Sequence, residues 1–417
     1  MSETVPVLSD TTIAPNPALT QPADANSGQK SRFILFSESW IELQAYTGAA
    51  IALPITQDEF QTKYGTFSGE QVIKDCIGAM KGVQSTATEF GNPKTLRAAL
   101  KENPNLLATA QPPDEIYTHT VWLGQKIHNT SQTLASGFKS VLDEVSGLPK
   151  ADQVEAIKAF LFDATLGPIP LGKTMSDEAG KLIKKLGAFE QKMNEYNEKL
   201  QAFTKSSSSM LALVNSTIGS IEQKIADLEK TRDDAYKAWR DFTIAAVTTS
   251  VGCFLIGAVL APFTGGASLL VGGVAAIATG VGLGVKAAQC RAEYNAACQM
   301  IDEETAEKQK KIRLRSDLGD FNTAMGRVGP AMSKFLKDLQ TVEGIWVQMN
   351  SDMLHISEMV NEGNVGTIPF LVKAKAQAAI DAWKNVDDSA KQFTVQSLVD
   401  YDGLAFGDPM PESRAAA

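Results

Sequence analysis

Histidine and cysteine are scarce in this chain, and neither occurs at the spacing of a metal or disulfide site. There are 3 histidines and 4 cysteines among 417 residues. His119 and His128 are nine positions apart, so they form no two-ligand pair on one helical turn, and no cysteine or carboxylate cluster has metal-ligand spacing. Four scattered cysteines are too few for a disulfide framework and indicate free thiols made in a reducing cytoplasm. The cysteines are Cys76, Cys253, Cys290 and Cys298.

Motifs for phosphate binding and nucleophilic catalysis are also missing. The sequence has no Walker-type phosphate loop and no Gly-x-Ser-x-Gly elbow. The glycine-rich run Gly280–Gly284 follows no strand, so dinucleotide binding is not expected. A net charge of −9 argues against nucleic-acid binding. The sequence therefore predicts no catalytic residue, no cofactor, no metal and no small-molecule substrate.

An export signal is absent from the first 30 residues. They hold four prolines among small polar residues, with no basic segment and no apolar segment after it. We expect residues 1–30 to be a disordered tail and the chain to be made without a signal peptide.

Charge is absent from one internal stretch, Phe242–Val285. This stretch is 44 residues long in a chain with 21% charged residues. It divides into the arms Phe242–Ala261 and Ala267–Val285, joined by a turn at Pro262–Gly266. Each arm has about the 20 residues that a helix needs to cross the ~30 Å hydrocarbon layer of a bilayer. The stretch is therefore predicted to be a membrane-active helical hairpin.

The composition of the hairpin differs between its apex and its arms. Bulky apolar residues gather near the turn and are predicted to enter the membrane first: Phe254, Leu255, Ile256, Val259, Leu260, Pro262, Phe263, Leu269, Leu270 and Val271. Small residues recur every four positions on one face of the second arm, a series that lets helices approach closely. These predicted helix-packing positions are Gly272, Ala276, Gly280 and Gly284.

Heptad patterns flank the hairpin on both sides. Apolar residues recur at alternating spacings of three and four from Leu182 to Phe242, with a slip after Ser206–Ser209, and again from Leu318 to Val360. Such a sustained pattern is typical of coiled-coil-like helices. Because no proline interrupts it, we expect one helix from Met175 to Ala261, weakened or bent at the serine run.

The predicted architecture is all-α and elongated, with a bundle tail, an antiparallel coiled-coil neck and the hairpin as the head. The expected segments are a disordered tail at 1–30, tail-bundle helices at 31–174, an ascending neck helix at 175–241, the head at 242–285, a descending neck helix at 286–362, a C-terminal tail-bundle helix at 363–402 and a frayed end at 403–417.

Three other interpretations of the hairpin remain open. It could be the two-span anchor of a resident membrane protein, such as a coiled-coil tether or scaffold. It could be the buried core of a large soluble bundle. It could also fold as a β-tongue against the neck, although the stretch lacks the alternation of a strand.

The order of these parts resembles the large α-helical pore-forming toxins of the cytolysin A type. Within that group the chain is similar to the alpha-xenorhabdolysin family of binary toxins, and to its A component. Phe242–Val285, flanked by Met175–Asp241 and Lys286–Val360, carries the resemblance. It implies a bacterial cytolytic protein, released without a signal peptide, that acts at the membrane of a target cell. It further implies a second subunit, the B component, and a hetero-oligomeric pore.

Overall fold

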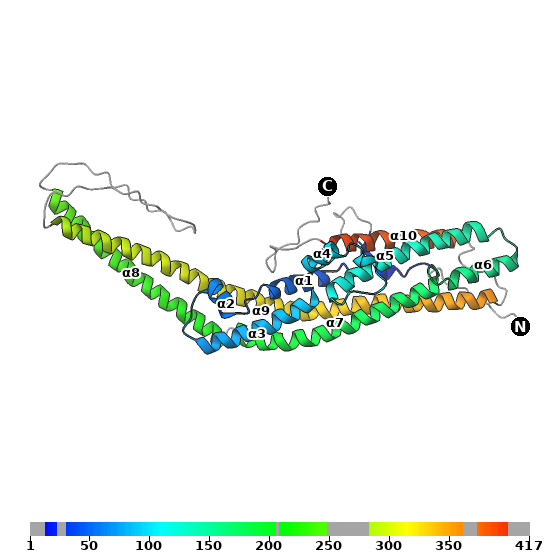
Figure 1. Ribbon diagram of the computed structural model, residues 1–417, viewed down its shortest axis with the longest axis horizontal. Helices are drawn as coiled ribbons and strands as arrows, with labels where there is room; N and C mark the ends of the chain where they lie inside the picture. Colours follow the sequence, from blue (N-terminus) through cyan, green and yellow to red (C-terminus); the bar gives the residue numbers. More distant parts are fainter. Residues whose placement is uncertain (1–12, 23–30, 206–207, 248–282, 362–372, 399–417) are drawn as a thin grey trace. The chain divides into compact units, whose positions relative to one another are not determined.

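The computed structural model describes residues 13–22, 31–205, 208–247, 283–361 and 373–398, and within these ranges the chain is almost entirely α-helical (Figure 1). The predicted all-α class is confirmed. The chain divides into two compact units. Unit 1 contains residues 1–59, 71–206 and 318–417, and unit 2 contains residues 60–70 and 207–317.

Unit 1 consists of helices and one small antiparallel sheet. Its elements are β1 (Thr20–Pro22), β2 (Ser31–Phe33), α1 (Glu38–Ile51), the start of α2 (Gln57–Tyr64), α3 (Glu70–Phe90) from Gln71, α4 (Pro93–Glu102), α5 (Ile116–Ser140), α6 (Lys150–Phe162), α7 (Pro168–Thr204), the second half of α9 (Leu283–Asn361) and α10 (Lys373–Gln396). Short 3-10 turns lie at Pro17–Leu19 and Leu106–Ala108, and a π turn at Val141–Val145 follows α5.

An aromatic cluster fills the core of unit 1. Trp40 in α1 stacks on Tyr117 in α5 with 4.9 Å between ring centroids, and on Phe335 in α9 with 5.2 Å. Phe90 and Phe393 also contact the Trp40 ring. Because these rings come from five helices, burial of one cluster fixes the bundle.

The heptad pattern of the return leg is confirmed as a buried stripe. All thirteen of its apolar positions between Leu318 and Val360 are buried in the second half of α9. The helix continues through Pro330 without a break in its assignment. The corresponding stripe in α7, which includes Leu182, Leu186 and Met193, is buried as well.

The predicted neck does not correspond to the division of the chain into units. Residues 175–206 and 318–361 lie in unit 1, since α7 also packs against α5 there. Only residues 207–317 of the predicted neck and head lie in unit 2.

The prediction of one helix from Met175 to Ala261 is wrong at Lys205. Helix α7 ends there, where the backbone turns to extended angles (φ −63°, ψ 146°). Helix α8 (Ser209–Val247) then begins, and the Ser208 hydroxyl accepts a hydrogen bond from the Leu211 N–H at 3.1 Å. Serine competes for backbone hydrogen bonds and favours helix starts. The serine run therefore supplies the N-terminal cap of α8.

The prediction of a disordered tail at 1–30 is wrong for residues 13–22. Strand β1 pairs with β2 in antiparallel register, with Thr20 opposite Phe33. Ile13 and Leu19 are buried, and the Trp383 Nε1–H donates a hydrogen bond to the Ile13 carbonyl at 2.8 Å. Contacts with α10, far away in the sequence, order this segment, so no local pattern revealed it.

Candidate functional site

The predicted head lies almost wholly outside the described residues. Residues 248–282 include all ten predicted membrane-insertion residues, from Phe254 to Val271, together with Gly272, Ala276 and Gly280. Gly284 lies in the first turn of α9. The described residues nearest the predicted head belong to α8, which leads into it, and to α9, which leads out of it; these parts of both helices lie in unit 2.

Helices α8 and α9 run antiparallel in unit 2 with one constant register. Glu222 pairs with Lys308 at 2.8 Å, and Lys224 forms an ion pair with Glu304. Farther from these pairs, Asn215 accepts a hydrogen bond from Arg315, and the Tyr236 and Tyr294 rings are 6.1 Å apart. Every pair is centred on position 264 or 265 of the sequence.

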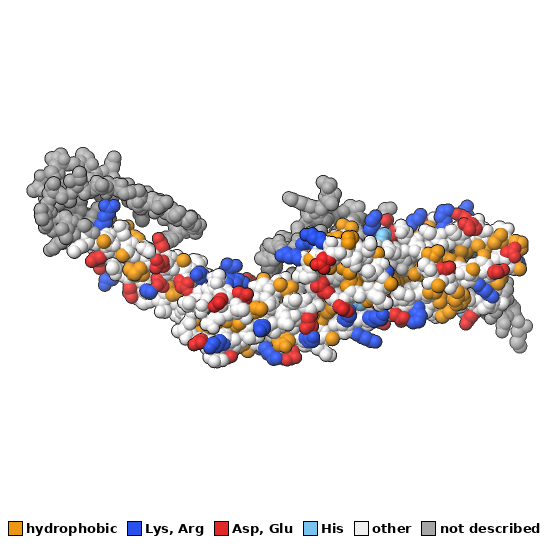
Figure 2. Space-filling view, in the orientation of Figure 1, with side chains coloured by type: hydrophobic (Ala, Val, Ile, Leu, Met, Phe, Trp, Pro, Cys, Tyr) orange, Lys and Arg blue, Asp and Glu red, His pale blue; other side chains and the backbone are white. Residues whose placement is uncertain are grey.

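The seam between these two helices is apolar but narrow. Val214, Ile218 and Ile221 are buried near the start of α8, whereas near the head the buried residues are the small Ala235 and Ala297. Charged residues of both signs alternate along the exposed faces of the two helices (Figure 2). The seam therefore loses apolar volume toward the head.

A short strap, residues 60–70, is fastened to α9 in unit 2 by a buried lysine. The Lys311 ammonium donates to the carbonyls of Tyr64 at 2.9 Å and Thr66 at 2.6 Å, and to the Glu307 carboxylate at 2.5 Å. Glu307 also accepts the Thr66 N–H at 3.1 Å. Gly65 has a φ of +76°, and a Cβ there would collide with the Glu307 carboxylate. Burial lowers the pKa of Lys311 although Glu307 opposes the shift.

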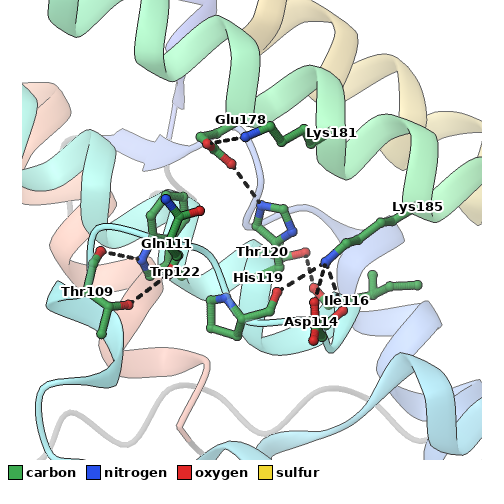
Figure 3. Close-up of polar contacts among 11 residues, drawn as sticks. Thr109, Gln111, Asp114, Ile116, His119, Thr120, Trp122, Glu178, Lys181 and Lys185 are labelled. Carbon is green, nitrogen blue, oxygen red and sulfur yellow. Dashed lines mark hydrogen bonds and ion pairs between the residues drawn. The ribbon is translucent and has the colours of Figure 1, made fainter.

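A second buried polar cluster lies in unit 1 between α5 and α7 (Figure 3). The His119 side chain is fully buried and its Nε2 is 3.9 Å from the Glu178 carboxylate, which Lys181 holds at 2.8 Å. Neither ring nitrogen of His119 has a hydrogen-bond partner among the described residues. Burial, together with Lys185 and Lys181, lowers the pKa of His119 to about 4. The sequence analysis rejected His119 as a metal ligand and missed this environment, because Glu178 comes from a helix 59 positions away.

An exposed apolar patch lies around α6 at one end of unit 1. Figure 2 shows hydrophobic side chains gathered there. Its largest members are Leu148, Phe162 and Leu166, of which Phe162 is 51% and Leu166 54% exposed. This patch is a further surface that the sequence analysis did not single out.

The described residues offer little for catalysis. Within the described ranges, no group of three or more His, Cys, Asp or Glu side chains could hold a metal ion. Cys76, Cys290 and Cys298 are free thiols, Cys253 lies outside the described residues, and burial raises the pKa of Cys76 to about 12. Among the helices in these ranges, none combines the length and apolarity that crossing a membrane requires.

Comparison with known protein families identifies the chain. A family model described as ApoL, apolipoprotein L, matches residues 153–396, which is more than half of the chain. The chain belongs to the apolipoprotein L family. The matched range of this family runs from within α6 to the end of α10 and includes the whole charge-free stretch. No curated protein matches the chain by sequence.

Several solved structures are similar to this apolipoprotein L family chain. A toxin component of Bacillus cereus, HblL1, is 15% identical with a TM-score of 0.46, over 87% of this chain and 95% of that one. The pre-pore form of AhlB, from the tripartite α-pore-forming toxin of Aeromonas hydrophila, is 14% identical with a TM-score of 0.41, over 93% and 99%. XaxA from Xenorhabdus nematophila is 11% identical with a TM-score of 0.28, over 88% and 97%. At these identities the likeness concerns the fold alone.

Proposed function

We propose that this chain is a pore-forming subunit that inserts the stretch 242–285 into the membrane of a target cell. The proposal includes the partner that the sequence resemblance implies, a second subunit with which the chain forms a hetero-oligomeric pore. The activity is physical, since lipid binding and assembly replace catalysis.

The observation that carries the proposal is the register of α8 and α9. Four contacts, all outside the charge-free stretch, are centred on position 264 or 265. The proline- and glycine-rich composition independently predicts the turn of the hairpin at Pro262–Gly266. The two assignments agree, and this supports a hairpin with two arms of matched length.

The composition of the stretch supports membrane entry as the role of that hairpin. A stretch of 44 uncharged residues contains no Asp, Lys or Arg, each of which costs about 2.5–3.5 kcal/mol at the centre of a membrane helix. Each arm also has the length of a bilayer span. Association with other copies or with a second subunit would satisfy polar groups that line a pore.

The test measures dye release from phosphatidylcholine vesicles by protein purified without detergent, alone and with an alpha-xenorhabdolysin-type B subunit. Ile256→Asp and Leu270→Arg should each reduce release at least tenfold, because each places a charge in the hydrocarbon layer. Ile256→Leu and Leu270→Ile are the matched controls and should retain activity.

The outcomes separate the proposal from its alternatives. Release that needs the second subunit and fails in the charged variants supports a two-component pore former. A chain that leaves the cell membrane only with detergent would indicate a resident anchor. A soluble chain that binds no vesicle, with or without the second subunit, would overturn the proposal.

A further inference from the structure

Two tyrosines face each other across α8 and α9 where unit 2 approaches the charge-free stretch. The Tyr236 and Tyr294 rings are 6.1 Å apart with a tilt of 46° between their planes. Tyr236 is 37% exposed and Tyr294 is partly buried. The seam beneath them is made of small side chains such as Ala235 and Ala297, so the ring pair lies at the margin of the seam rather than in a core.

Two exposed basic residues lie beside this ring pair. Lys237 follows Tyr236 in α8, and Arg291 precedes Tyr294 by one helical turn in α9. The Lys237 side chain is 65% exposed, and its contact with Asp234 is long, at 3.9 Å. A long, exposed ion pair holds its lysine weakly, so Lys237 can reach another anion.

Basic residues flank the charge-free stretch closely on both sides. From Lys237 to Arg291 the sequence contains four basic residues and a single acidic one, Asp241, although the whole chain has a net charge of −9. Beyond Tyr236 the charges of α8 are mixed, since Arg232 pairs with Asp233 at 2.9 Å, and on α9 Glu293 lies between Arg291 and Tyr294. Four basic residues therefore flank the charge-free stretch directly, two on each side of it.

The headgroup layer of a lipid bilayer is the environment that suits these features together. They are two tyrosine rings, two exposed cations and an adjoining apolar stretch. Tyrosine is enriched at the level of lipid headgroups, where its ring and its hydroxyl meet different media. Each lysine or arginine close to an anionic membrane surface raises the affinity for that membrane by at most about tenfold. The attraction decays within a Debye length of about 10 Å.

We propose that Tyr236, Lys237, Arg291 and Tyr294, here called the collar, bind the headgroups of an anionic lipid bilayer. This inference rests on the proposed function and adds the class of lipid that the chain recognises.

The test compares binding of the full chain to vesicles of pure phosphatidylcholine and to vesicles in which phosphatidylserine replaces part of it. The double variant K237Q/R291Q should lose about 5- to 30-fold in affinity for the anionic vesicles and little for the neutral ones. Raised salt should erase the difference between the two vesicle types.

Lys230→Gln is the matched control. Lys230 is exposed and lies seven positions before Lys237, on the same face of α8 but about 10 Å farther from the charge-free stretch. Its neutralisation should change binding less than twofold. A second variant, Y236A/Y294A, should weaken binding to both vesicle types, whereas thermal unfolding without lipid should show that it remains folded.

Each result decides between distinct claims. If K237Q/R291Q binds both vesicle types as well as the unmodified chain does, the lipid-binding role of the collar is contradicted while the proposed function stands. An equal loss in K237Q/R291Q and in Lys230→Gln would also overturn that role, because the effect would then follow net charge. No binding of the unmodified chain to either vesicle would instead contradict the proposed function.

Discussion

Unit 1 buries most of the large side chains of the molecule, whereas unit 2 is held by a narrow seam and by polar contacts. Among the described residues, the largest fully buried side chains in unit 1 are Trp40, Trp122, Trp346, Trp383, Tyr46, Tyr117, Phe33, Phe90 and Phe138. Those in unit 2 are Phe60, Tyr64 and Lys311. Phe60 and Tyr64 belong to the strap, and Lys311 donates hydrogen bonds to its carbonyls.

From this difference we expect unit 2 to open more easily than unit 1. A core of interlocked aromatic rings loses many contacts at once when it opens, so it opens cooperatively. The two-helix seam narrows to alanines near the charge-free stretch, so that end has less apolar area to lose, and surface ion pairs contribute only about 0–1 kcal/mol each. A chain that must expose a charge-free stretch to lipid would need this softness in unit 2.

The largest expected effect comes from removing the centre of the unit 1 core. Trp40→Ala should lower the free energy of unfolding by about 3–5 kcal/mol, because it removes a fully buried ring that stacks on two others. Urea unfolding followed by circular dichroism measures the change. Val395→Ala, at a residue that is 55% exposed, is the control and should change it by less than about 0.5 kcal/mol. A similar loss in both variants would contradict the assignment of the core.

Acid should weaken unit 1 through His119. The folded pKa of about 4 lies below the ordinary 6.5, so between these values the unfolded chain binds a proton that the folded chain excludes. This contribution to stability is fully present above pH 6.5 and falls by up to about 3 kcal/mol as the pH drops to 4.

Urea midpoints measured across that pH range test this prediction. His119→Met should flatten the pH dependence whatever its effect on absolute stability. His355→Gln is the control, since the His355 side chain is 46% exposed, and it should leave the dependence in place. A His119→Met profile parallel to that of the unmodified chain would show that other groups cause the acid response.

Removing the Lys311 hydrogen bonds to the strap in unit 2 should have a smaller effect on the free energy of unfolding. Lys311→Met should cost about 2 kcal/mol, because the Tyr64 and Thr66 carbonyls and the Glu307 carboxylate lose their donor. Hydrogen exchange should accelerate at residues 60–70 and in the adjoining part of α9, and not in the unit 1 core. Lys310→Met, at the exposed neighbour, is the control. Faster exchange in α5 or α10 would show that the two units do not open separately.

Patterns within one helix were predictable from the sequence, whereas contacts between distant segments were not. The stripe from Leu318 to Val360 is buried as predicted, because heptad spacing alone places it on one helical face. The pairing of β1 with β2 and the environment of His119 depend on partners from other elements, and no local spacing encodes them. The end of α7 at Lys205 was missed because the serine run was taken as a weak point and not as a helix cap.

The candidate site divides in the same way. The charge-free stretch was evident from composition, and its insertion residues and the small-residue series stay predictions. The collar was not recognised, although all four of its residues flank that stretch, because basic residues occur on both sides of it in nearly equal number. The contacts between α8 and α9, with the pair Tyr236 and Tyr294 nearest the stretch, bring the two flanks together.

The strap has a consequence for the order of events during synthesis. The Tyr64 hydroxyl donates to Asp317, and these two residues are 253 positions apart. At about 5–20 residues per second, a ribosome needs roughly ten to fifty seconds to make the intervening chain. Residues 242–285 emerge within that interval, before α9 is complete and before the strap can close. The nascent chain therefore presents its least soluble stretch while unit 2 is unfinished, and chaperone binding to the ribosome-bound chain should be strongest at these lengths.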